Sequence, residues 1–379
     1  MIFTMLKRIR KIEHSNMSKE VIKRRRLDVI DAVEQAVDDI KVIDEGPIKD
    51  WISTGCTVLD LAISNRYPGG IPLGRTVRIY GGESTCKTVL GMTILGSVQR
   101  KGGIAFFIDT ERTFDPVWAK LFGLKCSDLD IWRYGCWWNP GKVNEFDQPE
   151  TVEDLFDEYI NRIVSLDDPR PKVIIVDSLT ALPSKVEIEG DLGDASYGTT
   201  RAKQIGAGLR KYNGRLSSSN TSLIFIDQSR DAIGLQFGSK EVTSGGRAPK
   251  FYSSVIIHLR DGGKVTNKKK IEVGVWVNFK IVKNKAAPPF RKSSFKIIWN
   301  YGLDDVGTNL DFLKFCQELS GKEGARKSGR VLFDDKNMFM SQMIMHVEED
   351  NLEEKLEKEV FEKWTELYSQ EERKQRKWK

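Results

Sequence analysis

A short glycine-rich stretch between a predicted strand and a predicted helix constrains this chain more than any other feature. It runs Thr76-Val-Arg-Ile-Tyr-Gly-Gly-Glu-Ser-Thr-Cys-Lys-Thr88, and its apolar residues Val77 and Ile79 alternate with polar ones as in a short buried strand. Residues 89–98 continue without proline, as a buried helix would. A phosphate-binding loop has this order, because backbone N–H groups and the helix N-terminus surround the phosphates. The stretch therefore predicts a nucleotide site.

Two side chains of this loop have expected roles, and a third departs from the usual pattern. Lys87 would reach the β- and γ-phosphates, and the Thr88 hydroxyl would bind Mg²⁺. Cys86 stands where the pattern has glycine, so its side chain either crowds the phosphates or forces a backbone angle that costs about 1–2 kcal/mol. An ordinary strand-to-helix turn is the alternative for the loop taken alone. The other residues expected to contact the nucleotide are Gly81, Gly82, Glu83, Ser84 and Thr85.

Composition narrows the class of protein. The 379 residues are 40% hydrophobic and 30% charged, with a net charge of +6, which permits a polyanionic partner without requiring one. No apolar run has the length of a membrane span, and residues 1–6 are too short for a signal segment, with Met17 as an alternative start. The five cysteines show no CxxC pair, which indicates reduced thiols and a cytoplasmic location.

Three further apolar runs each lead to a polar residue. Residues 103–109 precede Glu111, which is placed to orient or deprotonate an attacking water. Residues 173–177 end at Asp177, an acid suited to the magnesium shell. Residues 222–228 end at Gln228, an amide that could sense a γ-phosphate. Since α/β folds keep their chemistry at the carboxyl ends of the strands, the sequence predicts an α/β nucleotide-binding fold with a mostly parallel sheet.

Two charged, glycine-rich loops follow these strands, at residues 187–194 and 237–250. Mobile loops with this mixture of Lys, Arg, Thr and Gly suit contacts to a phosphodiester backbone, although a flexible surface loop is the simpler interpretation. The tryptophans within 131–150 either stack on bases or plug a local hydrophobic gap. The basic segment 1–26 is either a solvated arm or a contact to nucleic acid or a neighbouring subunit.

Three parts are expected along the chain. Residues 1–46 form a basic arm and an amphipathic helix over 29–40 that needs a docking surface. Residues 47–307 form the nucleotide-binding core, extended by antiparallel strands around 255–260, 276–282 and 295–299. Residues 308–379 form a small C-terminal α+β domain that ends in a charged helix over 348–368 and a basic tail.

In this order the motifs resemble the bacterial RecA recombinase family over roughly residues 50–305. The resemblance rests on Ile52-Ser-Thr-Gly, Tyr80-Gly-Gly-Glu-Ser, Phe107-Ile-Asp-Thr-Glu-Arg, Asp115-Pro, Val176-Asp-Ser, Glu187-Ile-Glu-Gly, Leu209-Arg-Lys, Ser219-Asn-Thr, Phe225-Ile-Asp-Gln, Thr243-Ser-Gly-Gly, Lys250-Phe-Tyr and Val282-Lys-Asn-Lys. So many separated matches in register are specific to the family.

The resemblance implies a RecA-like fold, ATP and Mg²⁺ as cofactors, and a role in DNA recombination, DNA repair and the SOS response. Glu111 matches the catalytic glutamate and Asp177 the Walker B acid, while Asp115 and Trp118 match the adenine contacts. Gln228 matches the residue that links the γ-phosphate to the second DNA-binding loop. Lys283 and Lys285 match a pair that reaches ATP on the neighbouring subunit. The implied DNA-binding residues are Glu187, Gly190, Gly193, Arg201, Arg210, Gly238, Thr243, Gly245, Gly246, Arg247 and Lys250.

These implications define the expected function and its alternatives. The first is a DNA-dependent ATPase that forms a homo-oligomeric filament on single-stranded DNA and exchanges strands with double-stranded DNA. The second is a RecA-like mediator that binds DNA or a recombinase filament and hydrolyses ATP weakly or not at all, which Cys86 favours. A replicative helicase of the same superfamily fits less well, because the loops match the recombinases.

Overall fold

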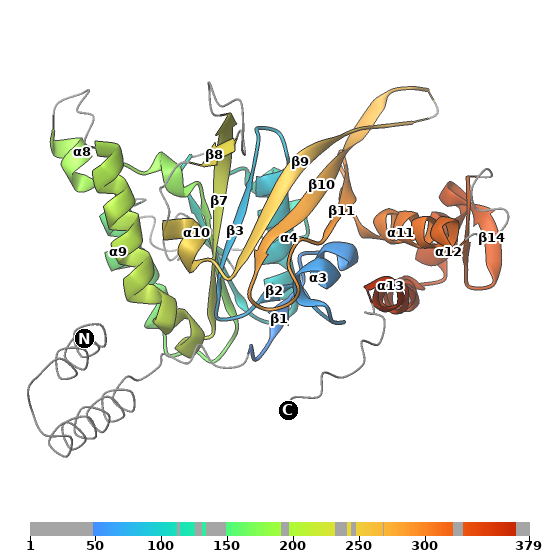
Figure 1. Cartoon of the computed structure of the whole chain (residues 1–379), viewed down its shortest axis with the longest axis horizontal. Coiled ribbons are helices and arrows are strands. Elements are labelled where there is room, and N and C mark those ends of the chain that lie inside the picture. Colours follow the sequence, from blue (N-terminus) through green and yellow to red (C-terminus); the bar gives the residue numbers. More distant parts are fainter. Residues whose placement is uncertain are drawn as a thin grey trace, which may run out of the picture. The chain divides into compact units, whose positions relative to one another are not determined.

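The computed structural model of the chain is shown in Figure 1. It describes residues 48–111, 114–125, 131–133, 149–190, 197–231, 241–243, 248–267, 269–320 and 329–368. The arm and helix predicted for residues 1–46, most of the Trp-containing segment 131–150, and the basic tail lie outside these described residues.

The centre of the fold is a sheet, to which ten strands contribute within the described ranges. Its order is β12-β11-β10-β9-β3-β7-β6-β4-β5, with β8 paired to β7 off this path. The parallel part comprises β9 (Val255–Thr266), β3 (Thr76–Gly81), β7 (Thr221–Asp231), β6 (Lys172–Asp177), β4 (Ile104–Asp109) and β5 (Ile131–Arg133). The predicted mostly parallel α/β sheet is confirmed.

The parallel strands are apolar along their whole length because both faces of the sheet are covered. Phe107, Ile175 and Ile226 pack on one face with helices α3 (Thr57–Ser64) and α4 (Lys87–Arg100). On the other face, Phe106 and Val176 pack beneath α9 (Tyr197–Ser218) and the segment α6 (Val152–Asp154), η1 (Leu155–Ile160) and α7 (Asn161–Val164). The alternation places successive side chains of each strand in different cores.

The sheet continues as an antiparallel extension, as the alternating sequence predicted. β9 pairs with β10 (Glu272–Asn284), which pairs with β11 (Lys292–Ile298) and then β12 (Gly302–Asp304). A small pair, β1 (Trp51–Ile52) and β2 (Ile71–Pro72), precedes the main sheet in the chain.

The C-terminal elements share the core of the sheet. They are α11 (Asp305–Leu319), the hairpin of β13 (Arg330–Phe333) and β14 (Lys336–Phe339), α12 (Met340–Glu349) and α13 (Glu353–Tyr368). Phe312 and Trp364 of this region belong to the same buried cluster as α3 and α4. The single helix predicted over 348–368 begins too early. In the structure α12 ends at Glu349, and a separate helix, α13, begins at Glu353.

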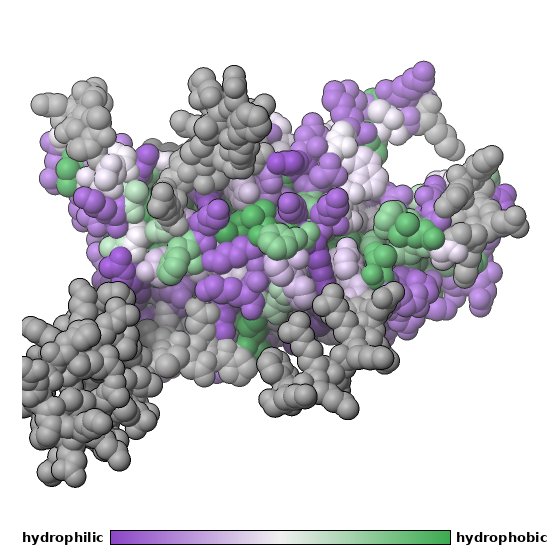
Figure 2. Space-filling model, viewed as in Figure 1, coloured by the Kyte–Doolittle hydropathy of each residue, from purple (hydrophilic) through white to green (hydrophobic). Residues whose placement is uncertain are grey.

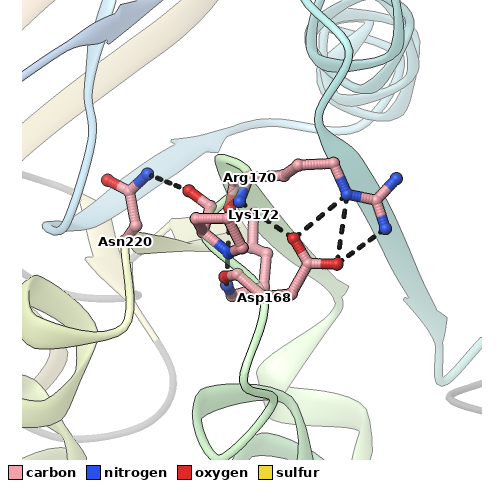
Figure 3. Close-up of polar contacts among 5 residues, drawn as sticks. Asp168, Arg170, Lys172 and Asn220 are labelled. Atoms are coloured by element: carbon pink, nitrogen blue, oxygen red, sulfur yellow. Dashed lines mark hydrogen bonds and ion pairs between the residues drawn. The ribbon is translucent and has the colours of Figure 1, made fainter.

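At the amino end of the parallel strands, charged side chains hold a loop in place (Figure 3). Arg170 makes several hydrogen bonds to the Asp168 carboxylate, at 2.7–3.1 Å. Lys172 is buried and donates to the Asp168 carbonyl oxygen at 2.5 Å, while Asn220 donates to the Pro169 carbonyl oxygen at 3.1 Å. Burial lowers the pKa of Lys172. These bonds satisfy the loop's own backbone, which indicates a structural role for this end of the sheet.

The face of the molecule in Figure 2 is mainly hydrophilic, with hydrophobic side chains in small separate patches. Within the described ranges, no helix combines the length and the apolar character needed to cross a membrane.

Candidate functional site

The phosphate loop joins β3 to α4 at the carboxyl edge of the sheet (Figure 1). A Cβ atom added to Gly81 would lie 2.3 Å from the Leu259 carbonyl oxygen, so only glycine fits against β9 there. Gly82 has open space around it. Cys86 is the N-cap of α4 and has left-handed backbone angles, φ 58° and ψ 30°. Its partly buried side chain packs against the hydrophobic core.

Lys87 lies at the first position of α4, with its ammonium group turned back onto the loop. Its Nζ donates to the Gly82 carbonyl oxygen at 2.6 Å and contacts Thr85 Oγ1 at 3.5 Å. Burial lowers the pKa of Lys87, and the nearby Asp177 and Glu111 carboxylates oppose that shift. The oxygens that accept from this buried ammonium are neutral, so the negative charge of a phosphate group would compensate it.

The ends of β4 and β6 meet the start of α4 beside the loop. Thr88 Oγ1 donates to Asp177 Oδ2 at 2.5 Å, and Ser178 Oγ donates to Glu111 Oε1 at 2.9 Å. Burial raises the pKa of Asp177 to about 6, against the opposing effect of the Thr88 hydrogen bond. A hydroxyl and a carboxylate oxygen in contact are suitable ligands for Mg²⁺, and the cation would favour the ionised carboxylate.

Gln228 is opposite Gly81 in the parallel pairing of β7 with β3, which places it at the start of the phosphate loop. The preceding residue, Asp227, is buried and forms an ion pair with Arg78 of β3, with 2.6 Å between Arg78 Nε and Asp227 Oδ2. The predicted position of Gln228 at the nucleotide edge therefore agrees with the strand register.

The two residues expected at adenine lie on α5 (Pro116–Lys120). Asp115 caps this short helix, and its Oδ1 accepts from Val117 N at 2.8 Å and Trp118 N at 3.4 Å. Trp118 is exposed over 40% of its surface and packs edge-to-face on Phe122 at 4.8 Å. Its exposed ring is available to stack on a flat ligand.

The residues expected at DNA lie on several separate elements. Glu187 and Gly190 are on or next to α8 (Lys185–Glu189), and Arg201 and Arg210 lie along α9. Figure 1 shows α8 beside one end of α9. Lys250 is on α10 (Ala248–Tyr252), and Thr243 ends β8 (Glu241–Thr243). Gly193, Gly238, Gly245, Gly246 and Arg247 lie outside the described residues.

The structure does not bring Lys283 to the phosphate loop of its own chain. Lys283 Nζ donates to the carbonyl oxygens of Lys250 and Phe251, both at 2.8 Å, at the end of α10. Lys285 is exposed. Lys283 lies near the end of β10, opposite Ile256 at the start of β9, and Lys285 N donates to the Ser254 carbonyl oxygen at 2.9 Å. Because β9 runs parallel to β3, this is the amino end of the parallel strands, away from Thr88 and Asp177.

Three polar residues of this region were not predicted from the sequence. Arg78 and Asp227 each interrupt an apolar strand, and a charge inside such a strand is the signal that could have pointed to them. Ser178 directly follows Asp177, but its bond to Glu111 depends on how two strand ends meet, which sequence does not reveal.

Comparisons with known proteins agree with this geometry. The sequence model of the RecA N-terminal domain matches residues 42–304. The chain is 40% identical to Protein RecA of Colwellia psychrerythraea over 276 residues, 72% of each chain. It is 41% identical to Protein RecA of Thermus thermophilus over 259 residues, covering 68% of this chain and 69% of the relative. Protein RecA of Clostridioides difficile is 39% identical over 264 residues, 69% of each chain. With the phosphate loop, the acids and the amide at one edge of a parallel sheet, these matches show that the chain belongs to the RecA family.

Proposed function

We propose that this chain is an ATP-dependent DNA recombinase, which forms filaments on single-stranded DNA and promotes homologous pairing and strand exchange with double-stranded DNA. The observation that carries the proposal is the convergence of Lys87, Thr88, Asp177, Glu111 and Gln228 at one edge of the sheet, in a chain of the RecA family. ATP hydrolysis is its enzymatic activity, with Mg²⁺ as the accompanying ion.

The chemistry that we assign is positioning and charge stabilisation. Lys87 and the N–H groups at the start of α4 bind the phosphates, and Asp115 and Trp118 hold the base. Thr88 and Asp177 would hold Mg²⁺, which would neutralise phosphate charge. Ser178 fixes Glu111 through Oε1, so Glu111 Oε2 is the oxygen to which we assign the proton of the attacking water.

DNA and a second protomer complete the active unit in this proposal. The loops around Glu187 and Lys250, with Arg201 and Arg210, contact the DNA backbone. Lys283 and Lys285 act on the ATP of a neighbouring subunit. Residues 1–46 pack protomers, residues 47–307 form the catalytic core, and residues 308–379 form a small C-terminal domain that shares its buried core with residues 47–307. The thiols of Cys56, Cys86 and Cys316 carry no disulfide, which supports a cytoplasmic location.

The mediator alternative is favoured by one observation, the left-handed backbone of Cys86 in the phosphate loop. A loop strained in this way would bind ATP less tightly than one with glycine. The intact arrangement of Glu111, Ser178 and Asp177 favours hydrolysis, because a protein that only binds filaments has no use for a positioned base.

ATP turnover with and without single-stranded DNA separates the two functions. We expect DNA to stimulate turnover, and we expect Glu111→Gln to keep ATP binding while losing about 10²–10⁴-fold in rate, the usual contribution of a general base. Joint-molecule formation with homologous duplex, against a heterologous duplex as control, tests strand exchange. Turnover of Glu111→Gln at the parent rate would show that the base is misassigned. A parent that binds ATP and DNA without turnover or joint molecules would support the mediator.

A further inference from the structure

A buried ion pair lies directly beneath the edge that carries Gln228. Arg78 of β3 and Asp227 of β7 are 2% and 0% exposed, and a single hydrogen bond of 2.6 Å joins Arg78 Nε to Asp227 Oδ2. Arg78 Nη2 and Asp227 Oδ1 are buried and have no hydrogen-bond partner among the described residues. The guanidinium thus makes one hydrogen bond to the carboxylate, although its planar geometry allows two parallel bonds, one to each oxygen.

A contribution to folding stability does not explain why this ion pair is buried here. Removing two charges from water is costly, and apolar side chains of similar size often replace a buried pair without loss of stability. Leaving one donor and one acceptor unsatisfied adds to the cost. Burial raises the pKa of Asp227, while Arg78 and the more distant Lys87 lower it, so the carboxylate is linked electrostatically to the phosphate loop. A costly, half-satisfied polar contact at this position calls for a functional account.

The pair lies where β7 leaves the sheet. The pairing of β6 with β7 ends at Ile226, and that of β3 with β7 ends at Gln228. Beyond this point β7 pairs only with β8 within the described residues, on the way into the second predicted DNA loop. Asp227 is therefore the last buried side chain before the strand that carries Gln228 becomes part of the loop region.

The Arg78 side of the pair is fixed. Its guanidinium lies 5.4 Å from the ring centre of Tyr80, and Tyr80 stacks on His258 of β9 with 4.5 Å between ring centres and 1° between planes. Gly81 is in tight contact with the Leu259 carbonyl of β9. β3 is thus packed closely on the β9 side, and on its other side it pairs with β7 as far as Gln228, the residue that directly follows Asp227.

We propose that Arg78 and Asp227 are positioning residues that transmit the state of the nucleotide site to the second DNA loop through the end of β7. The inference rests on the function proposed above. When a triphosphate engages Gln228, the end of β7 shifts against β3, and Arg78 Nη2 closes on Asp227 Oδ1. The loop that follows β7 then takes the arrangement that binds DNA.

The test measures how much nucleotide changes affinity for DNA. Dissociation constants for a fluorescent single-stranded oligonucleotide are measured with and without a slowly hydrolysed ATP analogue and Mg²⁺, and the analogue's own affinity is measured without DNA. The variants are Asp227→Asn, Arg78→Lys, and the apolar double variant Arg78→Met with Asp227→Leu. The matched control is Arg170→Lys, in the surface pair with Asp168 at the opposite end of the sheet (Figure 3).

We expect all three variants to bind the analogue with affinity within about threefold of the parent, while the nucleotide-induced gain in DNA affinity falls by about tenfold, within the usual range of coupling between sites. Arg78→Lys keeps the positive charge but cannot form two parallel hydrogen bonds to Asp227. If the role of Arg78 were purely electrostatic, this variant would keep the nucleotide-induced gain in DNA affinity. Arg170→Lys should match the parent.

Two results would overturn the proposal, and they differ in what else they affect. A folded apolar double variant with the parent's nucleotide-induced gain would reduce the pair to a structural contact while leaving the proposed function in place. A parent protein whose DNA affinity is the same with and without nucleotide would remove the proposed recombinase function as well. Circular dichroism and thermal unfolding of each variant establish that the double variant is folded.

Discussion

Cys86 shows how one side chain can alter a phosphate loop without blocking it. Its φ of 58° lies in the left-handed region, where a Cβ atom costs about 1–2 kcal/mol relative to glycine. The thiol is turned against the hydrophobic core, and burial raises its pKa, with Lys87 opposing the shift. Of the two effects expected from the sequence, the structure shows the backbone angle, while the partly buried thiol packs against the core.

Cys86→Gly tests that account. Glycine relieves the left-handed strain but adds about 0.5–1 kcal/mol of unfolded-state freedom, so the free energy of unfolding should change by less than about 1 kcal/mol. ATP affinity should stay the same or rise, as measured by equilibrium titration with a fluorescent analogue. In the parent, ATP should slow alkylation of Cys86, as followed by mass spectrometry. A large loss of affinity in the glycine variant would mean that this loop does not bind the phosphates.

At the scale of elements, two buried carboxyl groups, Asp60 of α3 and Asp305 of α11, lie near the start of α3. Asp60 Oδ1 accepts from Thr54 N and Thr54 Oγ1, at 2.7 and 2.6 Å, and Asp60 Oδ2 accepts from Ser53 Oγ at 2.6 Å. Asp305 of α11 accepts from Thr57 N at 2.7 Å. Burial raises the pKa values of Asp60 and Asp305 to about 7 each, despite these hydrogen bonds, and the Glu357 charge adds to both shifts. The contact between α3 and α11 is thus sensitive to pH near neutrality.

Asp60→Asn should flatten that pH dependence. A raised carboxyl pKa in the folded state gives stability that is present below the unfolded pKa of 3.8 and is lost as pH rises through about 7. Between pH 6 and pH 8 the parent should therefore lose about 1 kcal/mol more than Asp60→Asn, since one pKa unit corresponds to about 1.4 kcal/mol. Reversible urea unfolding at both pH values measures the difference.

Asp168→Asn is the matched control for this experiment. Hydrogen bonds from Arg170 lower the pKa of Asp168 to about 2, so its carboxylate is ionised at both pH values in the folded and unfolded protein. Its variant should follow the parent's pH dependence. If Asp60→Asn also follows the parent between pH 6 and pH 8, then Asp60 does not titrate in this range.

The elements that sequence predicts well are those with one strong signal. The apolar runs that lead to Asp109, Asp177 and Gln228 are continuous, and few structures other than a covered parallel sheet accommodate such runs. The break after α12 has no proline or glycine to mark it. The chain turns at Asn351, whose φ is 53°. Asparagine adopts this left-handed conformation more readily than most residues, but an asparagine in the sequence is not enough to predict a helix end.

Contacts between distant segments are harder to predict, because they depend on strand register. The order of strands in the sheet sets Asp227 beside Arg78 and Ser178 beside Glu111, and neither pair has a fixed spacing in the chain. Lys283 is a similar case. Its motif predicts a role at ATP, but only the fold reveals that its ammonium group is bound by the carbonyls at the end of α10.

At the scale of the whole molecule, the role proposed for Lys283 would link assembly to catalysis. In the protomer its Nζ has two carbonyl partners, and in a filament it would exchange them for the γ-phosphate of a neighbour, as an arginine finger does when supplied by another subunit. Turnover should then rise steeply with protein concentration and with single-stranded DNA. It should fall with salt, because phosphate contacts to DNA weaken as counterions compete.

Mixing two inactive variants tests this directly. Glu111→Gln lacks the base and keeps both lysines, whereas the double variant Lys283→Ala with Lys285→Ala lacks the lysines and keeps the base. If the site forms between protomers, some mixed interfaces carry both intact halves, and up to about a quarter of the parent turnover should return at equal amounts when the neighbours assort at random. Lys292→Ala, on β11, is a matched control that should be active alone.

The outcome depends on demonstrating co-assembly separately. Energy transfer between differently labelled variants on one single-stranded DNA would establish that they share filaments. With co-assembly shown, recovered turnover requires that the two halves come from different protomers, because neither chain contains a complete site. Absence of recovery under the same conditions would place both lysines in the site of their own chain. The release of Lys283 from the carbonyls of Lys250 and Phe251 would then be an event within one protomer, and DNA would activate hydrolysis without aligning neighbours.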